Sequence, residues 1–157
     1  MSQRSTEHAT FVIERTYPAS PARVFNAFAD PEAKTRWFVG PEDWSPDGHE
    51  IDFRVGGRER LSTGPPGGQL HTFDALYQDI VPDRRIVYTY EMHLDEVRIS
   101  VSLATIELVP AGDGTRLAFT EQSVFLDGAD YPAQREQGTR SLLDKLDAEL
   151  QREPVKR

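Results

Sequence analysis

Few side chains in this sequence could carry acid–base chemistry. Cysteine is absent and there are four histidines, so a cysteine nucleophile and a thiolate metal site are excluded. His71, His93, Glu91 and Glu121 fall in strand-like segments and form the one plausible acid–base set. None stands in an HxH, HExxH or paired-carboxylate spacing, so solvated strand residues are the ordinary alternative. We expect neither a metal site nor a bound cofactor.

Glu121 has the most unusual expected environment of this set. It follows Phe119 at an interval of two residues, and side chains at that interval share one face of a strand. A carboxyl on such an apolar face is buried, which is costly without a partner and raises its pKa. Arg54 and Arg98 are the candidate ion-pair partners. Glu121 and His71 are therefore the candidate catalytic residues.

Aromatic side chains dominate the segments expected to line a ligand cavity. A buried tyrosine hydroxyl needs a hydrogen-bond partner and can orient the polar end of a ligand. Aromatic residues also dominate ordinary protein cores, and that alternative stays open here. The predicted cavity residues are Trp37, Phe38, Trp44, Phe53, Phe73, Tyr77, Tyr88, Tyr90, Phe119, Leu142 and Leu146.

A strand and two short helices are expected to begin the fold. The segment 10–17 (TFVIERTY) is rich in β-branched and aromatic residues and predicts a strand. Ser20 before Pro21 and Asp30 before Pro31 each combine an N-cap residue with proline at the first helical position. These pairs predict two consecutive short helices, the second reaching to about residue 38.

The middle of the chain reads as six strands. They are expected at 49–55, 58–62, 69–81, 85–94, 96–109 and 115–125. Gly56 and Gly57 predict a hairpin turn, because no helix and no GxGxxG pattern follow them. The apolar residues at odd positions of 97–103 are expected to share one face. Short connections between all these strands require antiparallel pairing.

A long amphipathic helix is expected at 133–151. Leu142, Leu143, Leu146 and Leu150 form one apolar stripe, and Gly138 costs the helix about 1 kcal/mol relative to alanine. A lone helix of this kind must lay its stripe on the sheet. The gap between the two is the expected ligand site. The predicted fold class is thus α+β: a curved antiparallel sheet of about seven strands around a long C-terminal helix.

Length and charge limit the functions open to the chain. Its 157 residues match one domain, taken as 1–157 with an ordered core of about 10–151. The net charge of −8 disfavours nucleic acid and anionic membranes as partners. The first residues are polar, unlike a signal peptide, and no segment approaches the roughly 18 apolar residues of a membrane span. A cytoplasmic location is the expectation.

Several short segments, in this order along the chain, carry a family resemblance. They are 13–28 (IERTYPASPARVFNAF), 30–32 (DPE), 36–38 (RWF), 53–57 (FRVGG), 80–88 (IVPDRRIVY) and 114–117 (GTRL). From about residue 10 to 150, the sequence resembles the activator of heat-shock-protein-90 ATPase-like family of the START, polyketide-cyclase and Bet v 1-like (SRPBCC) superfamily. This resemblance implies the helix-grip fold with a hydrophobic cavity.

Three functions are compatible with these observations. The favoured one is a binding module that holds a small apolar molecule, lipid-like or aromatic, between the C-terminal helix and the sheet. A polyketide-cyclase-like or hydrolase-like enzyme would instead use Glu121, His71 or a cavity tyrosine as proton carrier. A chaperone-assisting module would need an exposed apolar patch for its protein partner. A homodimer is compatible with each of these functions.

Overall fold

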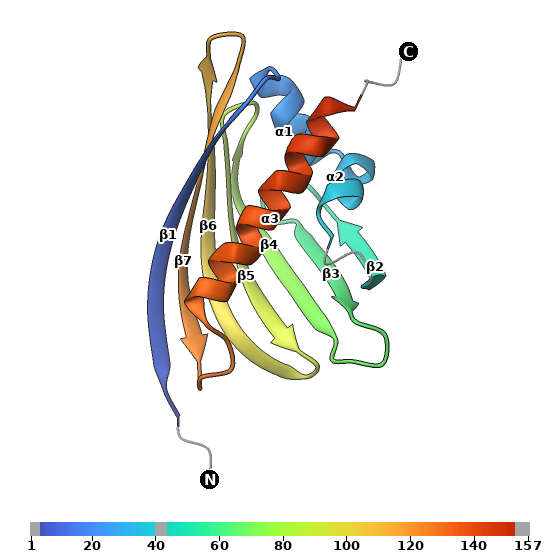
Figure 1. Ribbon diagram of the computed structural model, residues 1–157, viewed down its shortest axis with the longest axis vertical. Helices are drawn as coiled ribbons and strands as arrows, with labels where there is room; N and C mark the ends of the chain where they lie inside the picture. Colours follow the sequence, from blue (N-terminus) through green and yellow to red (C-terminus); the bar gives the residue numbers. More distant parts are fainter. Residues whose placement is uncertain (1–3, 40–43, 153–157) are drawn as a thin grey trace.

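A seven-stranded antiparallel sheet curves around the C-terminal helix (Figure 1). The computed structural model describes residues 4–39 and 44–152. The strands are β1 (Thr6–Tyr17), β2 (Ser45–Ile51), β3 (Arg58–Gly64), β4 (His71–Val81), β5 (Arg85–Leu94), β6 (Val97–Ala111) and β7 (Gly114–Leu126). Their order in the sheet is β1-β7-β6-β5-β4-β3-β2. Strands β2 to β7 each pair with the next strand along the chain, whereas β1 pairs with β7. The predicted fold class is confirmed.

Two short helices follow β1, as the cap signals predict. They are α1 (Pro21–Ala29) and α2 (Pro31–Trp37). The Ser20 hydroxyl accepts a hydrogen bond from the Arg23 amide at 3.1 Å, and the Asp30 carboxylate accepts one from the Glu32 amide at 3.3 Å. Each cap satisfies an amide that the first helical turn leaves without a partner.

The C-terminal helix α3 (Pro132–Gln151) crosses the concave face of the sheet diagonally (Figure 1). The Tyr17 hydroxyl on β1 donates to the Leu143 carbonyl at 2.9 Å. Arg23 on α1 donates to the Glu149, Leu150 and Arg152 carbonyls at 3.0–3.2 Å. These contacts fix the C-terminal half of α3 against β1 and α1. No helix in the described part of the chain is long and apolar enough to cross a membrane.

The inward face of β6 begins with the small residues Ser100, Ser102 and Ala104, and the large apolar residues Ile106 and Leu108 follow further along the strand. A β-bulge at Ile99 shifts the pairing with β5, so that Ile99 and Ser100 are both buried. Beyond the bulge the even positions, beginning with Ser102, point inward, while Val97 and Val101 are exposed. The odd positions of 97–103 therefore do not share the buried face throughout.

The segment after β2 turns earlier than the sequence pattern predicts. Strand β2 ends at Ile51, and 52–57 form a turn closed by hydrogen bonds from the Arg54 amide to Asp52 and from the Gly57 amide to Arg54. Gly56 has a φ of +86°, a backbone conformation that glycine adopts without strain. Phe53 consequently lies in a turn and not in a strand.

Candidate ligand-binding site

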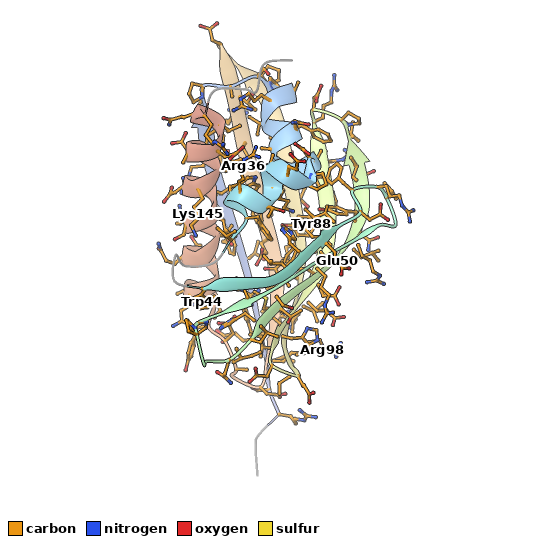
Figure 2. The ribbon with its side chains drawn as sticks, turned by 90° about the vertical axis from the view of Figure 1, so that its right-hand side faces the viewer. Arg36, Trp44, Glu50, Tyr88, Arg98 and Lys145 are labelled. Carbon is orange, nitrogen blue, oxygen red and sulfur yellow. The ribbon has the colours of Figure 1, made fainter. Side chains whose placement is uncertain are left out.

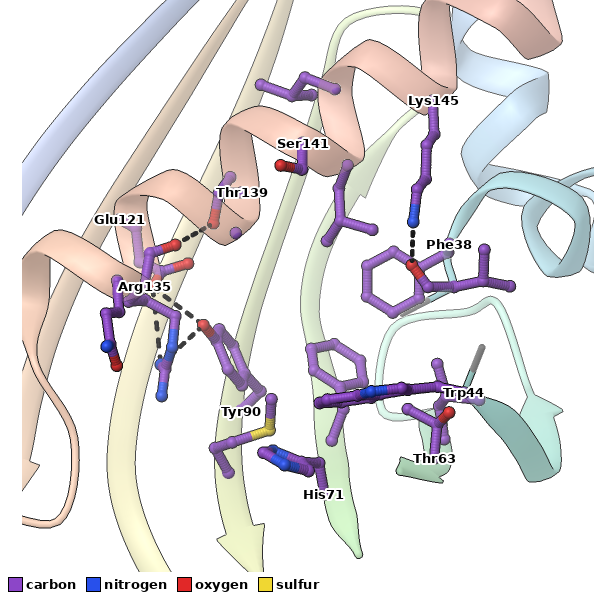
Figure 3. Close-up of a pocket in the computed structure, with 18 of the residues that line it drawn as sticks. Phe38, Trp44, Thr63, His71, Tyr90, Glu121, Arg135, Thr139, Ser141 and Lys145 are labelled. Atoms are coloured by element: carbon purple, nitrogen blue, oxygen red, sulfur yellow. Dashed lines mark hydrogen bonds and ion pairs between the residues drawn. The ribbon is translucent and has the colours of Figure 1, made fainter. Parts of the chain in front are cut away.

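A cavity of about 750 Å³ lies between α3, the end of α2 and the concave face of the sheet (Figure 3). Cavities of roughly 300–1,000 Å³ are typical of small-molecule sites. The lining contains both candidate catalytic residues, Glu121 and His71. Of the predicted cavity residues it contains Trp37, Phe38, Trp44, Phe73, Tyr88, Tyr90, Phe119 and Leu142.

Three predicted cavity residues are not among the lining, which corrects the sequence-based expectation. Phe53 packs in its turn against Phe25 and Tyr77, with ring centroids 5.7 and 5.0 Å away. Tyr77 donates its hydroxyl proton to the buried Glu59 instead of to a ligand. Leu146 is fully buried in the core. The periodicity of apolar residues in strands and helices predicts which side chains are buried. It does not distinguish a cavity wall from the core.

One side of the cavity is built from aromatic rings in edge-to-face and tilted contact. The Phe38 and Phe73 ring centroids are 5.0 Å apart, and those of Phe73 and Tyr90 are 4.8 Å apart. Trp44 packs against His71 at 4.6 Å between centroids, and it lies immediately before β2 (Figures 2 and 3). Burial lowers the pKa of His71, and this effect exceeds that of two aspartates, whose negative charges raise the pKa. The His71 ring therefore favours the neutral form.

The other side of the cavity holds a buried carboxyl, as predicted for Glu121. Its side chain is only 1 % exposed. The Tyr90 hydroxyl donates to Glu121 Oε2 at 2.9 Å, and the Ser123 hydroxyl donates to the same oxygen at 3.2 Å. Burial raises the pKa of Glu121, although the charge of Arg135 and these two hydrogen bonds partly offset that effect.

The cation beside Glu121 is Arg135 and not one of the two predicted arginines. Arg135 Nη1 lies 3.9 Å from Glu121 Oε2. Arg54 pairs with Asp52 at 2.9 Å, because both lie in the turn after β2. Arg98 lies 3.7 Å from Glu91 on the exposed end of the sheet.

Besides its contact with Glu121, Arg135 joins three polar groups that the sequence pattern does not connect. It donates to the Tyr90 hydroxyl at 3.1 Å, to Ser100 Oγ at 2.9 Å and to Asp130 Oδ2 at 2.7 Å. The available signal was the apolar stripe of α3, which continues backward from Leu143 through Thr139 to Arg135 at intervals of four residues. Both of these polar residues are buried in the structure.

The remaining members of the predicted acid–base set lie apart from the cavity. His93 Nε2 is 3.5 Å from Glu91 Oε1, and both side chains are partly exposed. Neither residue belongs to the cavity lining. Of the predicted acid–base set, His71 and Glu121 are thus the two members that line the cavity.

A second cluster of buried charges borders the cavity at α2. Lys34 Nζ lies 2.6 Å from Glu59 Oε1, and His49 Nε2 lies 2.8 Å from Glu59 Oε2. Burial raises the pKa of Glu59, but the charge of Lys34 and the hydrogen bonds from His49, Lys34 and Tyr77 outweigh it and lower the pKa to about 2. Lys34 belongs to the lining, with Nζ 4.4 Å from the centroid of the Phe38 ring.

A curved sheet around a C-terminal helix, with a ligand-sized cavity between them, defines a helix-grip domain of the ligand-binding SRPBCC superfamily. Residues 18–151 match the family described as "Activator of Hsp90 ATPase homolog 1-like protein". The chain belongs to this family, as its sequence resemblance implies. No protein with a curated functional description matches the chain.

Solved structures of similar proteins share this fold. An uncharacterized protein from Rhizobium leguminosarum is 49% identical, with a TM-score of 0.92 over 97% of this chain and 100% of its own. The Mll3558 protein from Rhizobium loti is 51% identical, with a TM-score of 0.86 over 92% of this chain and 99% of its own. CalU16 from Micromonospora echinospora is 19% identical, with a TM-score of 0.64 over 96% of this chain and 87% of its own, a likeness of fold alone.

Proposed function

We propose that this protein binds a small apolar molecule, lipid-like or aromatic, in the cavity between α3 and the sheet. The observation that carries the proposal is a cavity of about 750 Å³ walled mainly by aromatic and aliphatic side chains. Burial of roughly 300 Å² of apolar ligand surface contributes roughly 7 kcal/mol before the costs of association. That gross contribution supports binding without any covalent chemistry.

The polar groups of the cavity support the same proposal. In the described residues, every fully buried side-chain nitrogen or oxygen has a hydrogen-bond partner. The enclosed polar atoms of the walls therefore need no ligand to satisfy them. The exposed large apolar side chains, by comparison, are dispersed over β1, the turn after β2, β6 and the segment before α3. A chaperone-assisting surface would need them to form one patch.

Proton-transfer catalysis is a second candidate function, favoured by one specific observation. Glu121 is a buried carboxyl in the cavity lining, and burial raises its pKa. Perturbed carboxyls of this kind serve as general acids or bases in enzymes, although structural networks also perturb pKa values. Binding of a ligand is the step that both functions share, so it is tested first.

Gly138 offers a direct test of binding, because it lines the cavity from α3. A Cβ atom at this position would meet no heavy atom within 4 Å outside the helix backbone. Gly138→Phe should fill the cavity and weaken binding of the neutral fluorophore N-phenyl-1-naphthylamine at least about tenfold, with the circular dichroism spectrum retained. Gly138→Ala is the matched control and should bind as the wild type does.

The wild type and Gly138→Phe also serve to identify the natural ligand. Native mass spectrometry of freshly purified wild type should show an adduct of a few hundred daltons that is absent from Gly138→Phe and lost on denaturation. Equal fluorophore affinity in wild type and Gly138→Phe would show that the bound probe is not in this cavity, and the proposal would be rejected.

A further inference from the structure

The hydrogen bonds at the polar side of the cavity have a forced direction. An arginine guanidinium can only donate, so the Tyr90 hydroxyl oxygen accepts from Arg135 Nη1 at 3.1 Å. The proton of that hydroxyl is then directed to Glu121 Oε2 at 2.9 Å. The Ser123 hydroxyl donates to the same oxygen at 3.2 Å. Oε2 is therefore the accepting oxygen of this carboxyl, as Figure 3 shows for the contacts from Tyr90 and Arg135.

The other oxygen of Glu121 is available to a ligand. Among the described residues no hydrogen bond reaches Glu121 Oε1, whereas every fully enclosed side-chain oxygen there has a partner. An oxygen without a partner is therefore one with access to the cavity, which Glu121 lines. Because Oε2 accepts two hydrogen bonds, a proton on this carboxyl belongs on Oε1, where it is directed to a ligand.

The charges around Glu121 favour an uncharged ligand group. The Arg135 guanidinium is neutralised by Asp130 at 2.7 Å. The hydroxyls of Tyr90 on β5 and Ser123 on β7 face the carboxyl, and Ser102 on β6 hydrogen-bonds to Ser123 behind it. His71 borders the cavity from β4, with its pKa lowered by burial. With Glu121 protonated, a state that burial favours, this side of the cavity has no net charge.

We propose that Glu121 Oε1 donates a hydrogen bond to an uncharged carbonyl oxygen, so that the ligand is an apolar ketone or ester. A carbonyl oxygen only accepts, which matches the single donor. A carboxylate would bring a charge beside Arg135, whose guanidinium is already paired with Asp130. A hydrocarbon would leave the carboxyl proton without an acceptor. This inference rests on the proposed binding function and specifies the chemistry that the cavity recognises.

Three probes with one ring system test the inference. They are 2-acetylnaphthalene, 2-ethylnaphthalene and 2-naphthoate, each measured by displacement of N-phenyl-1-naphthylamine from pH 5 to pH 9. At the acid end the ketone should bind about tenfold more tightly than the hydrocarbon, the increment expected of one buried hydrogen bond, and the carboxylate should bind more weakly than the ketone. The preference for the ketone should disappear as rising pH ionises Glu121.

Variants of Glu121 separate a donor from a mere structural carboxyl. Glu121→Gln places an amide N–H where Oε1–H was and does not ionise, so it should retain the preference for the ketone at every pH. Glu121→Leu should bind both neutral probes equally. The infrared carbonyl stretch of bound 2-acetylnaphthalene should lie at lower wavenumber in the wild type and Glu121→Gln than in Glu121→Leu. Glu91→Gln, outside the cavity, is the control and should behave as the wild type.

The outcomes distinguish this inference from the proposed function. If the ketone and the hydrocarbon bind the wild type equally, the carbonyl assignment is wrong while the binding function stands. If the preference persists in Glu121→Leu, a different residue supplies the donor and the assignment to Glu121 is wrong. If neither the fluorophore nor any naphthalene probe binds, both the binding function and the inference are overturned.

Discussion

Two buried glutamates illustrate how neighbours decide the chemistry of one residue type. Glu59 and Glu121 are each 1 % exposed. Glu59 lies 2.6 Å from Lys34 and also accepts from His49, and its pKa is lowered to about 2. The cation nearest Glu121 is 3.9 Å away and shared with Asp130, so burial prevails and the pKa is raised. One carboxyl is thus held as an anion, whereas the other keeps its proton to a higher pH than an ordinary glutamate does.

These opposite shifts predict opposite effects of pH on stability. The folded-state pKa of Glu59 lies below its ordinary value of 4.5, so its contribution is present above that value and is lost as pH falls toward about 2. The folded-state pKa of Glu121 lies above 4.5, so its contribution is present below 4.5 and is lost as pH rises through the raised pKa. The free energy of unfolding is measured in urea from pH 2.5 to pH 8 for the wild type, Glu59→Gln and Glu121→Gln.

The stability gap between wild type and Glu59→Gln should narrow toward acid pH. Relative to Glu121→Gln, the wild type should instead lose stability as the pH rises above about 4.5. Gaps that change with pH in the same direction for both variants would contradict the two assigned environments.

At the scale of elements, α3 depends on the two short helices for its position. Its first residues have no side-chain cap, since Tyr131 makes no capping hydrogen bond. Its last carbonyls, by contrast, are satisfied by Arg23, and Glu149 accepts from Arg36 at 2.7 Å. The N-terminal part of α3 is then free to line the cavity while its C-terminal end is held.

Arg23→Ala tests this anchoring of α3. Removal of the guanidinium leaves the carbonyls of the last turn without their donor, which should lower the free energy of unfolding by about 1–2 kcal/mol. Hydrogen exchange should also become faster in the last turn of α3. Arg140→Ala, which removes only a surface pair with Glu136, is the control and should cost less than about 0.5 kcal/mol. Equal losses in the two variants would show that Arg23 does not cap α3.

At the scale of the whole molecule, the sheet and the helices share one apolar core that includes part of the cavity wall. Buried apolar residues from β1, β4, β5, β6, β7 and the helices form one cluster. The net charge of the chain is −8, and most of the charged side chains lie outside the buried core. A ligand that binds the folded chain alone should therefore stabilise the molecule as a unit.

Ligand-linked stability is the corresponding prediction. At a concentration of N-phenyl-1-naphthylamine about 100 times its Kd, the free energy of unfolding of the wild type should rise by about 2.7 kcal/mol. Gly138→Phe should gain little, because its cavity is filled. Gly138→Ala should gain as much as the wild type, from a starting stability higher by up to about 1 kcal/mol. A gain in Gly138→Phe equal to that of the wild type would place the binding outside the cavity.

Local patterns in the sequence determined the elements and much of the wall. Proline after serine or aspartate marked both short helices, alternation marked the inward faces of β4 and β5, and the spacing from Phe119 predicted the burial of Glu121. These signals succeed because capping and alternation depend on residues near in the chain.

The tertiary structure alone decided what surrounds Glu121. Its neighbours Tyr90, Ser123 and Arg135 come from β5, β7 and α3, and a bulge at Ile99 turns the small polar residues of β6 toward them. Arg54, one of the two cations predicted to meet Glu121, pairs with Asp52 instead. The sequence by itself determined the fold class, the caps and the burial of Glu121, because periodicity is a local property. Which cation meets that carboxyl, and which aromatic rings border a cavity rather than the core, depends on how distant segments pack, and no local pattern records that.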